Sequence, residues 1–305
     1  MKKIISTILS RFGKEYNNQK VKNQNAKDAL FFTFYFLLCQ MYSGVQIVLK
    51  YLYYSLTASN GKGHGIHSPF VFDFIKNVLN DKKEYPEYEM IEDLRQELLK
   101  DQTLLTIEDL GAGSSVNKSK QRRISSIAKS VVKQKKYSQL LFRIVKRYKP
   151  GSILELGTSL GITTSYIAAG NPDAKIITME GAGEVANIAK QNFTTLKLQN
   201  IQLAEGNFEN TLPSVVSGLL SVDFAFIDGN HRREPTLNYF QQLLPKTYSD
   251  SIFIFDDIHW SKEMEQAWET IKANEAVRCS IDLFFIGIIF FRNEFKGKQN
   301  FKIRF

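Results

Sequence analysis

Short apolar runs alternate with segments of helical spacing through the second half of this chain of 305 residues. Runs that are apolar on both faces and that alternate with helices are typical of a doubly wound, mainly parallel sheet. A longer apolar run at 283–291, which Gly287 interrupts, is interpreted as part of a closing antiparallel pair. The fold class is therefore expected to be α/β, and the predicted parallel strands cover residues 153–156, 174–179, 201–204, 222–227 and 251–255.

Acidic residues stand at the ends of four of these predicted strands. Glu155 and Glu180 mark the first two, Asp228 marks the fourth, and Asp256 and Asp257 mark the fifth. In open parallel sheets, ligands bind beyond the carboxyl ends of the strands. The placing of these acids therefore predicts a ligand site at one edge of the sheet.

A glycine turn follows the first predicted strand, with Gly157 in the turn and Gly161 at the start of a helix. Glycine suits such a turn because it tolerates positive φ and has no side chain to block a ligand. The turn lacks the third glycine of the G-x-G-x-x-G fingerprint, which would seat a pyrophosphate on the helix N-terminus. Thr158 and Ser159 instead offer hydroxyls that can donate hydrogen bonds to a ligand carboxylate.

Four segments follow one another along the chain: ELGTSLG at 155–161, Glu180, FIDGNH at 226–231 and FDD at 255–257. Together they resemble the class I S-adenosylmethionine-dependent methyltransferases. Within that class they are similar to the catechol and caffeoyl-CoA O-methyltransferase group. The resemblance implies a Rossmann-like, seven-stranded, mainly parallel sheet and methyl transfer from S-adenosylmethionine to an oxygen of a small molecule. It also implies that Glu180 accepts hydrogen bonds from both ribose hydroxyls. The cofactor-binding residues that it implies are Glu155, Gly157, Thr158, Ser159, Gly161, Glu180, Asn207 and Asp228.

The same group uses two aspartates and an asparagine to hold Mg²⁺, which binds two substrate oxygens and lowers the hydroxyl pKa. The matching residues are Asp228, Asp256 and Asp257, and Asp257 departs from the group because it replaces the asparagine. Metal ligation and simple capping of a strand and a helix by these aspartates are both left open. His231 stands where the group carries a catalytic lysine, so Asp228 and His231 are the catalytic candidates. His231 is interpreted either as the base that takes the substrate proton or as a loop anchor.

A second glycine motif, DLGAGS at 109–114, mimics a cofactor turn. A working copy would need an acid on a second strand about 20 residues later. Residues 110–154 contain no Asp or Glu at all. The motif is therefore interpreted as a loop and not as a second cofactor site.

The net charge of +9 is unevenly distributed, because residues 110–154 hold 12 Lys or Arg and residues 1–28 hold seven against two acids. Such clusters attract acidic substrates, nucleic acids or anionic membranes. They also arise as the solvated faces of amphipathic helices, and the apolar spacing from Ile124 to Val145 favours that interpretation. We expect a small-molecule acceptor, with an acidic one left open, and no nucleic-acid partner, because no nucleic-acid module is recognised.

Residues 30–49 form an uncharged run of twenty residues, which is long enough to span a bilayer. The positive-inside rule would then place the catalytic domain outside the cell, away from an intracellular cofactor. We therefore expect a buried or peripheral helix with membrane contact through the N-terminal extension, or a natural start at Met41. Cys39 and Cys279 provide no disulfide framework and suit a reducing, cytoplasmic location.

Three parts are expected along the chain: a basic and apolar helical extension at 1–60, a helical cap with basic helices at 61–150, and the methyltransferase domain at 151–305. Two other functions stay open, a nucleic-acid methyltransferase and a binding protein with a methyltransferase fold. No N-P-P-Y-type motif follows the fourth strand, which weakens N-methylation. The sequence predicts neither the acceptor nor the oligomeric state.

Overall fold

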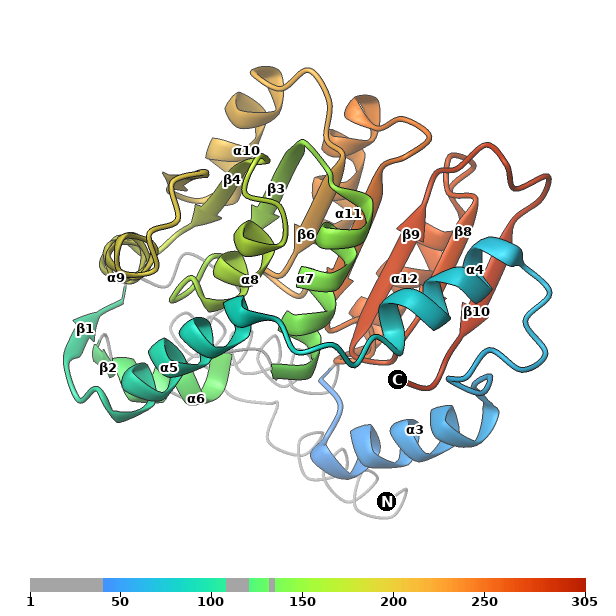
Figure 1. Ribbon diagram of the computed structural model, residues 1–305, viewed down its shortest axis with the longest axis horizontal. Helices are drawn as coiled ribbons and strands as arrows, with labels where there is room; N and C mark the ends of the chain where they lie inside the picture. Colours follow the sequence, from blue (N-terminus) through green and yellow to red (C-terminus); the bar gives the residue numbers. More distant parts are fainter. Residues whose placement is uncertain (1–40, 108–120, 132–134) are drawn as a thin grey trace, which may run out of the picture. The chain divides into compact units, whose positions relative to one another are not determined.

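An eight-stranded sheet forms the centre of the described part of the chain, which covers residues 41–107, 121–131 and 135–305 of the computed structural model (Figure 1). Its strands are β3 (Ser152–Leu156), β4 (Lys175–Glu180), β5 (Ile201–Glu205), β6 (Phe224–Ile227), β7 (Ile252–Asp256), β8 (Cys279–Asp282), β9 (Ile286–Phe290) and β10 (Gln299–Lys302). The order is β10-β8-β9-β7-β6-β3-β4-β5. The strands from β7 to β5 in this order run parallel, and β9 is antiparallel to both of its neighbours. The prediction of a doubly wound, mainly parallel α/β sheet is confirmed.

One detail of the predicted sheet is wrong. The sheet of the described residues has eight strands and not seven, because β10 pairs in parallel with β8 at the edge. The antiparallel pair predicted at 283–291 is confirmed, and Gly287 lies inside β9, opposite Phe255. A Cβ at Gly287 would come within 2.6 Å of the Trp268 ring, so the glycine makes room for that indole. A glycine in a strand often marks such a close approach.

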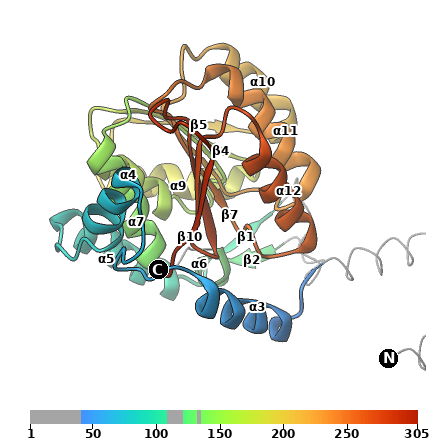
Figure 2. The ribbon, with the colours of Figure 1, turned by 90° about the vertical axis from the view of Figure 1, so that its right-hand side faces the viewer.

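Helices cover both faces of the sheet (Figure 2). Phe224 and Phe226 of β6 pack into one core and Ala225 and Ile227 into another, which is the alternation expected of a strand buried on both sides. The elements α4, η1 and α7 contribute to the first core, and α10, α11 and α12 contribute to the second. The helices are α4 (Pro69–Phe74), the π-helix η1 (Ile75–Leu79), α5 (Pro86–Lys100), α6 (Ile124–Val131), α7 (Lys135–Tyr148), α8 (Ile162–Gly170), α9 (Gly183–Thr195), α10 (Phe208–Ser217), α11 (Arg233–Leu243), the 3₁₀-helix η2 (Leu244–Lys246) and α12 (Lys262–Ala273).

The basic stretch forms amphipathic helices, as the apolar spacing predicts. Its first described residues belong to β2 (Gln121–Arg123), which pairs with β1 (Leu104–Thr106) ahead of α6. In α7, Arg143 is buried and its Nε donates to the Val78 carbonyl at 2.8 Å, and Arg147 lies 3.0 Å from Asp73. Part of the basic charge is therefore used inside the fold. The motif at 109–114 lies in the segment 108–120, outside the described residues.

The helix α3 (Gly44–Thr57) begins in the middle of the uncharged run at 30–49. Ser43 has extended backbone angles, and its side chain and that of Gln46 form a capping box. One continuous helix over the whole run is therefore excluded. Within the described ranges, no helix is both long and apolar enough to cross a membrane.

The division into parts at 1–60, 61–150 and 151–305 remains a prediction. Residues Ser43–Phe305 form one compact unit. Leu140 and Ile144 of α7 share a core with the sheet residues Ile153 and Phe224.

Candidate active site

The carboxyl ends of four parallel strands meet at one edge of the sheet. Leu156 of β3 is level with Met179 of β4 and with Ile227 of β6, and Ile227 is level with Phe255 of β7. Most of the predicted site residues lie on or just beyond this row: Glu155, Gly157, Thr158, Ser159, Glu180, Asp228, Asp256 and Asp257. The structure thus brings together side chains that lie up to about 100 positions apart in the sequence.

The turn after β3 depends on a glycine for two reasons. Gly157 has φ +106°, a backbone conformation that residues with a side chain rarely adopt. A Cβ at this position would also lie 2.0 Å from the carbonyl oxygen of Asp228. The amides of Gly157 and Thr158 both donate to the Met179 carbonyl at 3.0 Å. The turn is therefore pressed against the ends of β4 and β6, so the crowding that excludes a side chain comes from the protein backbone itself.

Gly161 precedes α8 as its N-cap with φ +79°. A Cβ there would come within 2.6 Å of the Phe193 ring in α9. This glycine lets α8 start close to α9. Its role in the fold is packing, whatever ligand the turn holds.

Glu155 is fully buried beneath the turn. Its Oε2 accepts hydrogen bonds from the hydroxyls of Thr164 and Thr178, the latter at 2.6 Å. The Thr178 hydroxyl also lies 2.6 Å from the Thr158 hydroxyl. Because the proton of Thr178 goes to Glu155, Thr158 must donate in that contact, so Thr158 braces the turn and has no hydroxyl proton left for a ligand.

Burial raises the pKa of Glu155 to about 8. The two threonine hydrogen bonds oppose this shift, and the neighbouring Asp228 carboxylate adds to it. Among the described residues, Oε1 of Glu155 is buried without a hydrogen-bond partner. A buried carboxyl oxygen in that state is costly unless a ligand completes its bonding.

Glu180 and Ser159 face each other across the turn. The Ser159 amide donates to Glu180 Oε2 at 2.8 Å, and the Ala182 amide donates to Oε1 at 3.0 Å. Burial raises the pKa of Glu180, and these backbone hydrogen bonds partly offset the shift. In the described part of the chain, the Ser159 hydroxyl oxygen is buried and has no partner. Ser159 Oγ and Glu155 Oε1 are therefore two polar atoms beside one turn that have no hydrogen-bond partner among the described residues. Such a pair fits a ligand with a charged, hydrogen-bonding tail.

Asn207 lies at the end of β5 and caps α10. Its Oδ1 accepts from the Glu209 amide at 2.9 Å. The preceding Gly206, at φ +130°, donates its amide to the Glu180 carbonyl at 2.9 Å. The predicted cofactor residue Asn207 is thus held beside Glu180, with its carbonyl oxygen occupied by capping.

His231 lies between two aspartates beyond β6 and β7. Its Nε2 is 3.6 Å from Asp228 Oδ1, and its Nδ1 is 3.9 Å from Asp257 Oδ2. Asn230, His231 and Asp257 have φ of +65°, +23° and +53°. Non-glycine residues in such conformations cost energy and cluster at functional sites. The His231 side chain is 32% exposed, so a substrate atom can reach it.

The predicted Mg²⁺ site finds no support in the geometry. Among the described residues, no group of three or more His, Cys, Asp or Glu side chains is arranged to hold a metal ion. Asp256 is 3% exposed at the end of β7, whereas Asp257 approaches His231. The residues present therefore do not fit a three-carboxylate metal centre.

A charged cluster beside this site was not expected from the sequence. Nδ1 of His259 lies 2.9 Å from Glu265 Oε1, and Nε2 lies 2.9 Å from Asp282 Oδ2. Burial by itself lowers the pKa of His259, but the two carboxylates outweigh it and raise the pKa above its usual value. The imidazole also stacks on Phe284. His259 is a clamp between the loop after β7 and the end of β8, and no local motif signals it because Asp282 lies 23 positions away.

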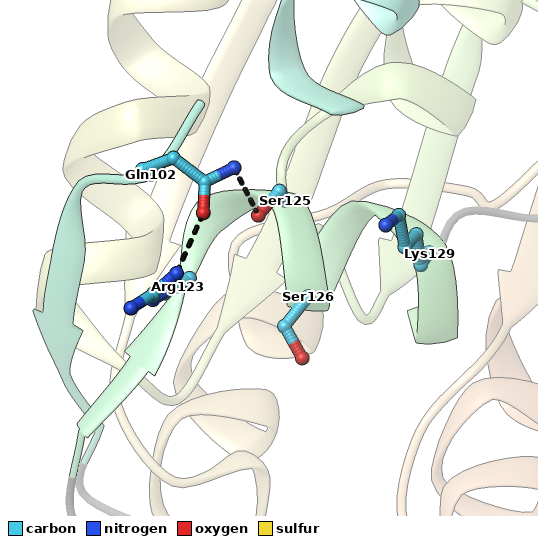
Figure 3. A pocket seen from close by; sticks show the side chains of 5 residues that line it. All are labelled: Gln102, Arg123, Ser125, Ser126 and Lys129. Atoms are coloured by element: carbon cyan, nitrogen blue, oxygen red, sulfur yellow. Dashed lines mark hydrogen bonds between the residues drawn. The ribbon is translucent and has the colours of Figure 1, made fainter. Parts of the chain in front are cut away.

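A polar hollow lies apart from the predicted site residues, beside α6 and β2 (Figure 3). Gln102 connects its two sides, since its amide donates to the Ser125 hydroxyl at 3.3 Å and its Oε1 accepts from Arg123 at 2.8 Å (Figure 3). Its lining residues are Gln102, Arg123, Ser125, Ser126 and Lys129. The hollow has two cationic side chains and no aromatic one, so it lacks the stacking surfaces of a single-strand nucleic-acid site.

Comparisons with known proteins agree with this geometry. Residues 154–258 match the family described as "Methyltransferase domain". No curated protein matches the chain. A solved O-methyltransferase from Bacillus cereus in complex with SAH is similar with a TM-score of 0.50 at 17% identity, over 72% of this chain and 97% of that one. A Klebsiella pneumoniae structure described as a candidate O-methyltransferase has a TM-score of 0.50 at 16% identity, over 69% and 92%. Residues 154–258 are therefore similar to a methyltransferase domain, and the fold matches that of the solved O-methyltransferases.

Proposed function

We propose that this methyltransferase domain transfers a methyl group from S-adenosylmethionine to a hydroxyl oxygen of a small molecule. One observation carries the proposal. At a single edge of the sheet, a turn with two buried polar atoms that lack a hydrogen-bond partner among the described residues lies near a histidine flanked by two carboxylates. The first arrangement suits the amino-acid tail of the cofactor, and the second suits removal of a hydroxyl proton.

The residues beside β3 and β4 would hold the cofactor. Glu180, whose carboxylate is fixed by two backbone amides, keeps lone pairs to accept from the ribose hydroxyls. The Ser159 hydroxyl can donate to the tail carboxylate, and Glu155 Oε1 can bond to its amine. Bound S-adenosylmethionine supplies a methyl group that an oxygen nucleophile can accept.

The residues beside β6 and β7 would handle the proton. A hydroxyl attacks poorly while it keeps its proton, and a phenolic hydroxyl has a pKa of about 10. As the oxygen forms its bond to the methyl carbon, the imidazole of His231 accepts the hydroxyl proton. Asp228 and Asp257, one on each side of the ring, stabilise the imidazolium that forms.

Two further features of the acceptor and location are part of the proposal. The 12 Lys or Arg residues at 110–154 favour an acceptor with an acidic group. The buried free thiol of Cys279 favours the reducing environment of the cytoplasm. The basic and apolar N-terminal extension favours peripheral contact with a membrane.

The experiment has two stages. Calorimetry with S-adenosylmethionine tests binding, and transfer of a labelled methyl group to a panel of hydroxylated acceptors, with and without chelator, tests chemistry. Binding together with turnover that survives the chelator supports the proposal. Turnover that chelator stops and Mg²⁺ restores would replace the histidine base by a metal mechanism. Label found only in added RNA or DNA would favour a nucleic-acid methyltransferase, and binding without any turnover would favour a non-catalytic binding protein.

A further inference from the structure

Helix α3 carries a continuous apolar stripe on its outer side. The stripe residues recur at helical spacing and are each at least 52% exposed. They are Val45, Val48, Leu49, Leu52 and Leu56. Tyr53, which is 67% exposed, flanks the stripe. Contiguous exposed apolar surface of this kind marks an interaction site more often than isolated surface leucines do.

The orientation of α3 is fixed by its inner side, so the stripe cannot turn inward. Tyr54 is buried, and its hydroxyl donates to the Ile303 carbonyl at the end of the sheet. Tyr51 packs edge-on against Phe284. Lys50 is the single charged residue of the helix, and its Nζ lies 3.0 Å from Glu265 in α12. The anchored side of α3 therefore carries its only charge, and the outer side carries none.

The sequence before α3 favours one kind of partner for this stripe. Because α3 starts at Gly44, the uncharged sequence ahead of its N-cap is limited to residues 29–42. These 14 residues are too few to span a bilayer as a helix. Residues 1–28 carry seven basic and two acidic side chains, which complement an anionic surface. The binding of a helix to a membrane surface strengthens with the apolar area that it buries and with its electrostatic attraction to anionic lipids.

We propose that the outer face of α3 docks on an anionic lipid bilayer, with the helix in the plane of the headgroups and the stripe in contact with the acyl chains. The stripe has no charge and, Tyr53 aside, no hydrogen-bonding side chain with which to select a protein partner. A bilayer needs none. The basic residues at 1–28 contribute the long-range attraction, and the aliphatic side chains contribute the apolar burial.

The test uses the full-length chain and sedimentation with vesicles of phosphatidylcholine alone or mixed with phosphatidylserine. We expect binding to the mixed vesicles, weaker binding to phosphatidylcholine, and weakening by added salt. Leu52→Glu should lower the partition coefficient by about tenfold or more, because a charge replaces buried apolar surface. Leu220→Glu is the matched control, since Leu220 is fully exposed between α10 and β6 and should bind as the wild type does.

Three outcomes would overturn the proposal. The first is no binding to mixed vesicles, or equal binding by Leu52→Glu. The second is a melting temperature that Leu52→Glu lowers by several degrees while Leu220→Glu does not, which would mean that the protein's own N-terminal residues cover the stripe. The third is a wild-type dimer in light scattering that Leu52→Glu dissociates without any vesicle binding, which would assign the stripe to a second copy.

Discussion

The two halves of the proposed active site differ in how firmly they are held. Beside β3 and β4, Glu155 accepts a hydrogen bond from the Thr178 hydroxyl at 2.6 Å, and Glu180 accepts from two backbone amides at 2.8 and 3.0 Å. Beside β6 and β7, His231 approaches its two aspartates only to 3.6 and 3.9 Å, from a backbone in a left-handed conformation.

This difference separates binding from chemistry. A cofactor site gains affinity when its polar groups are already in place before the ligand arrives. A catalytic base often has long hydrogen bonds in the free enzyme, which tighten only when substrate is bound. The β3–β4 half is thus prepared for a ligand, and the β6–β7 half is expected to complete its contacts with the acceptor.

The largest effect is expected from Gly157→Ala, which changes the turn in the firmly held half of the site, beside β3 and β4. The added Cβ overlaps the Asp228 carbonyl at 2.0 Å and strains a φ of +106°, so we expect a loss of about 3 kcal/mol or more in unfolding free energy and no measurable cofactor binding. Urea unfolding and calorimetry measure both. Gly297→Ala is the control, because no atom lies within 4 Å of the added Cβ.

Replacing Gly111 and Gly113 by alanine should leave cofactor binding in place. Loss of cofactor binding in that variant, with binding kept in Gly157→Ala, would move the cofactor turn to 109–114.

The next effect concerns the loosely held half. His231→Ala should lower kcat by about 100-fold or more, the usual contribution of a general base, while cofactor affinity stays unchanged. Methyl-transfer kinetics and calorimetry on the same variant separate the two quantities. His64→Ala is the control, since His64 is an exposed histidine far along the chain. Full activity in His231→Ala would show that His231 only anchors its loop.

Glu180→Ala should weaken S-adenosylmethionine binding by about 2–4 kcal/mol, because hydrogen bonds to a charged acceptor contribute about 1.5–3 kcal/mol each and do not add fully. Its neighbour in register on β5, Glu205, is exposed and paired with Lys190, so Glu205→Ala serves as the control. An unchanged affinity in Glu180→Ala would remove the ribose assignment.

The last prediction is a pH dependence of stability from Glu155. Its pKa is raised from 4.5 to about 8 in the folded protein, so the folded state holds a proton that the unfolded state releases in this range. Stability from this group is fully present below about pH 4.5, falls by at most about 1.4 kcal/mol per pH unit as pH rises, and levels off above about pH 8. Glu155→Gln keeps an acceptor for the two threonines and should flatten this slope in urea unfolding. A slope equal to that of the wild type would show that Glu155 is ionised in the fold.

Some features that were missed were still present in the sequence. Ser43 and Gln46 follow the S-x-x-Q pattern of a capping box, which predicts a helix start inside the uncharged run. Other features had no local signal. Trp268 explains Gly287, and Asp282 explains His259, yet each pair comes together only because α12 and β8 pack beside β7 and β9.

The sequence by itself determined the five parallel strands and the acids at their ends, because burial on both faces imposes an apolar run and a ligand site imposes polar residues where that run stops. It also predicted a glycine turn at Gly157 after the first strand. Only the tertiary structure decided which groups the acids meet: Thr164 and Thr178 for Glu155, backbone amides for Glu180, and His231 between Asp228 and Asp257. The physical reason is that hydrogen bonding and burial depend on neighbours in space, which are set by strand order and register and not by spacing along the chain.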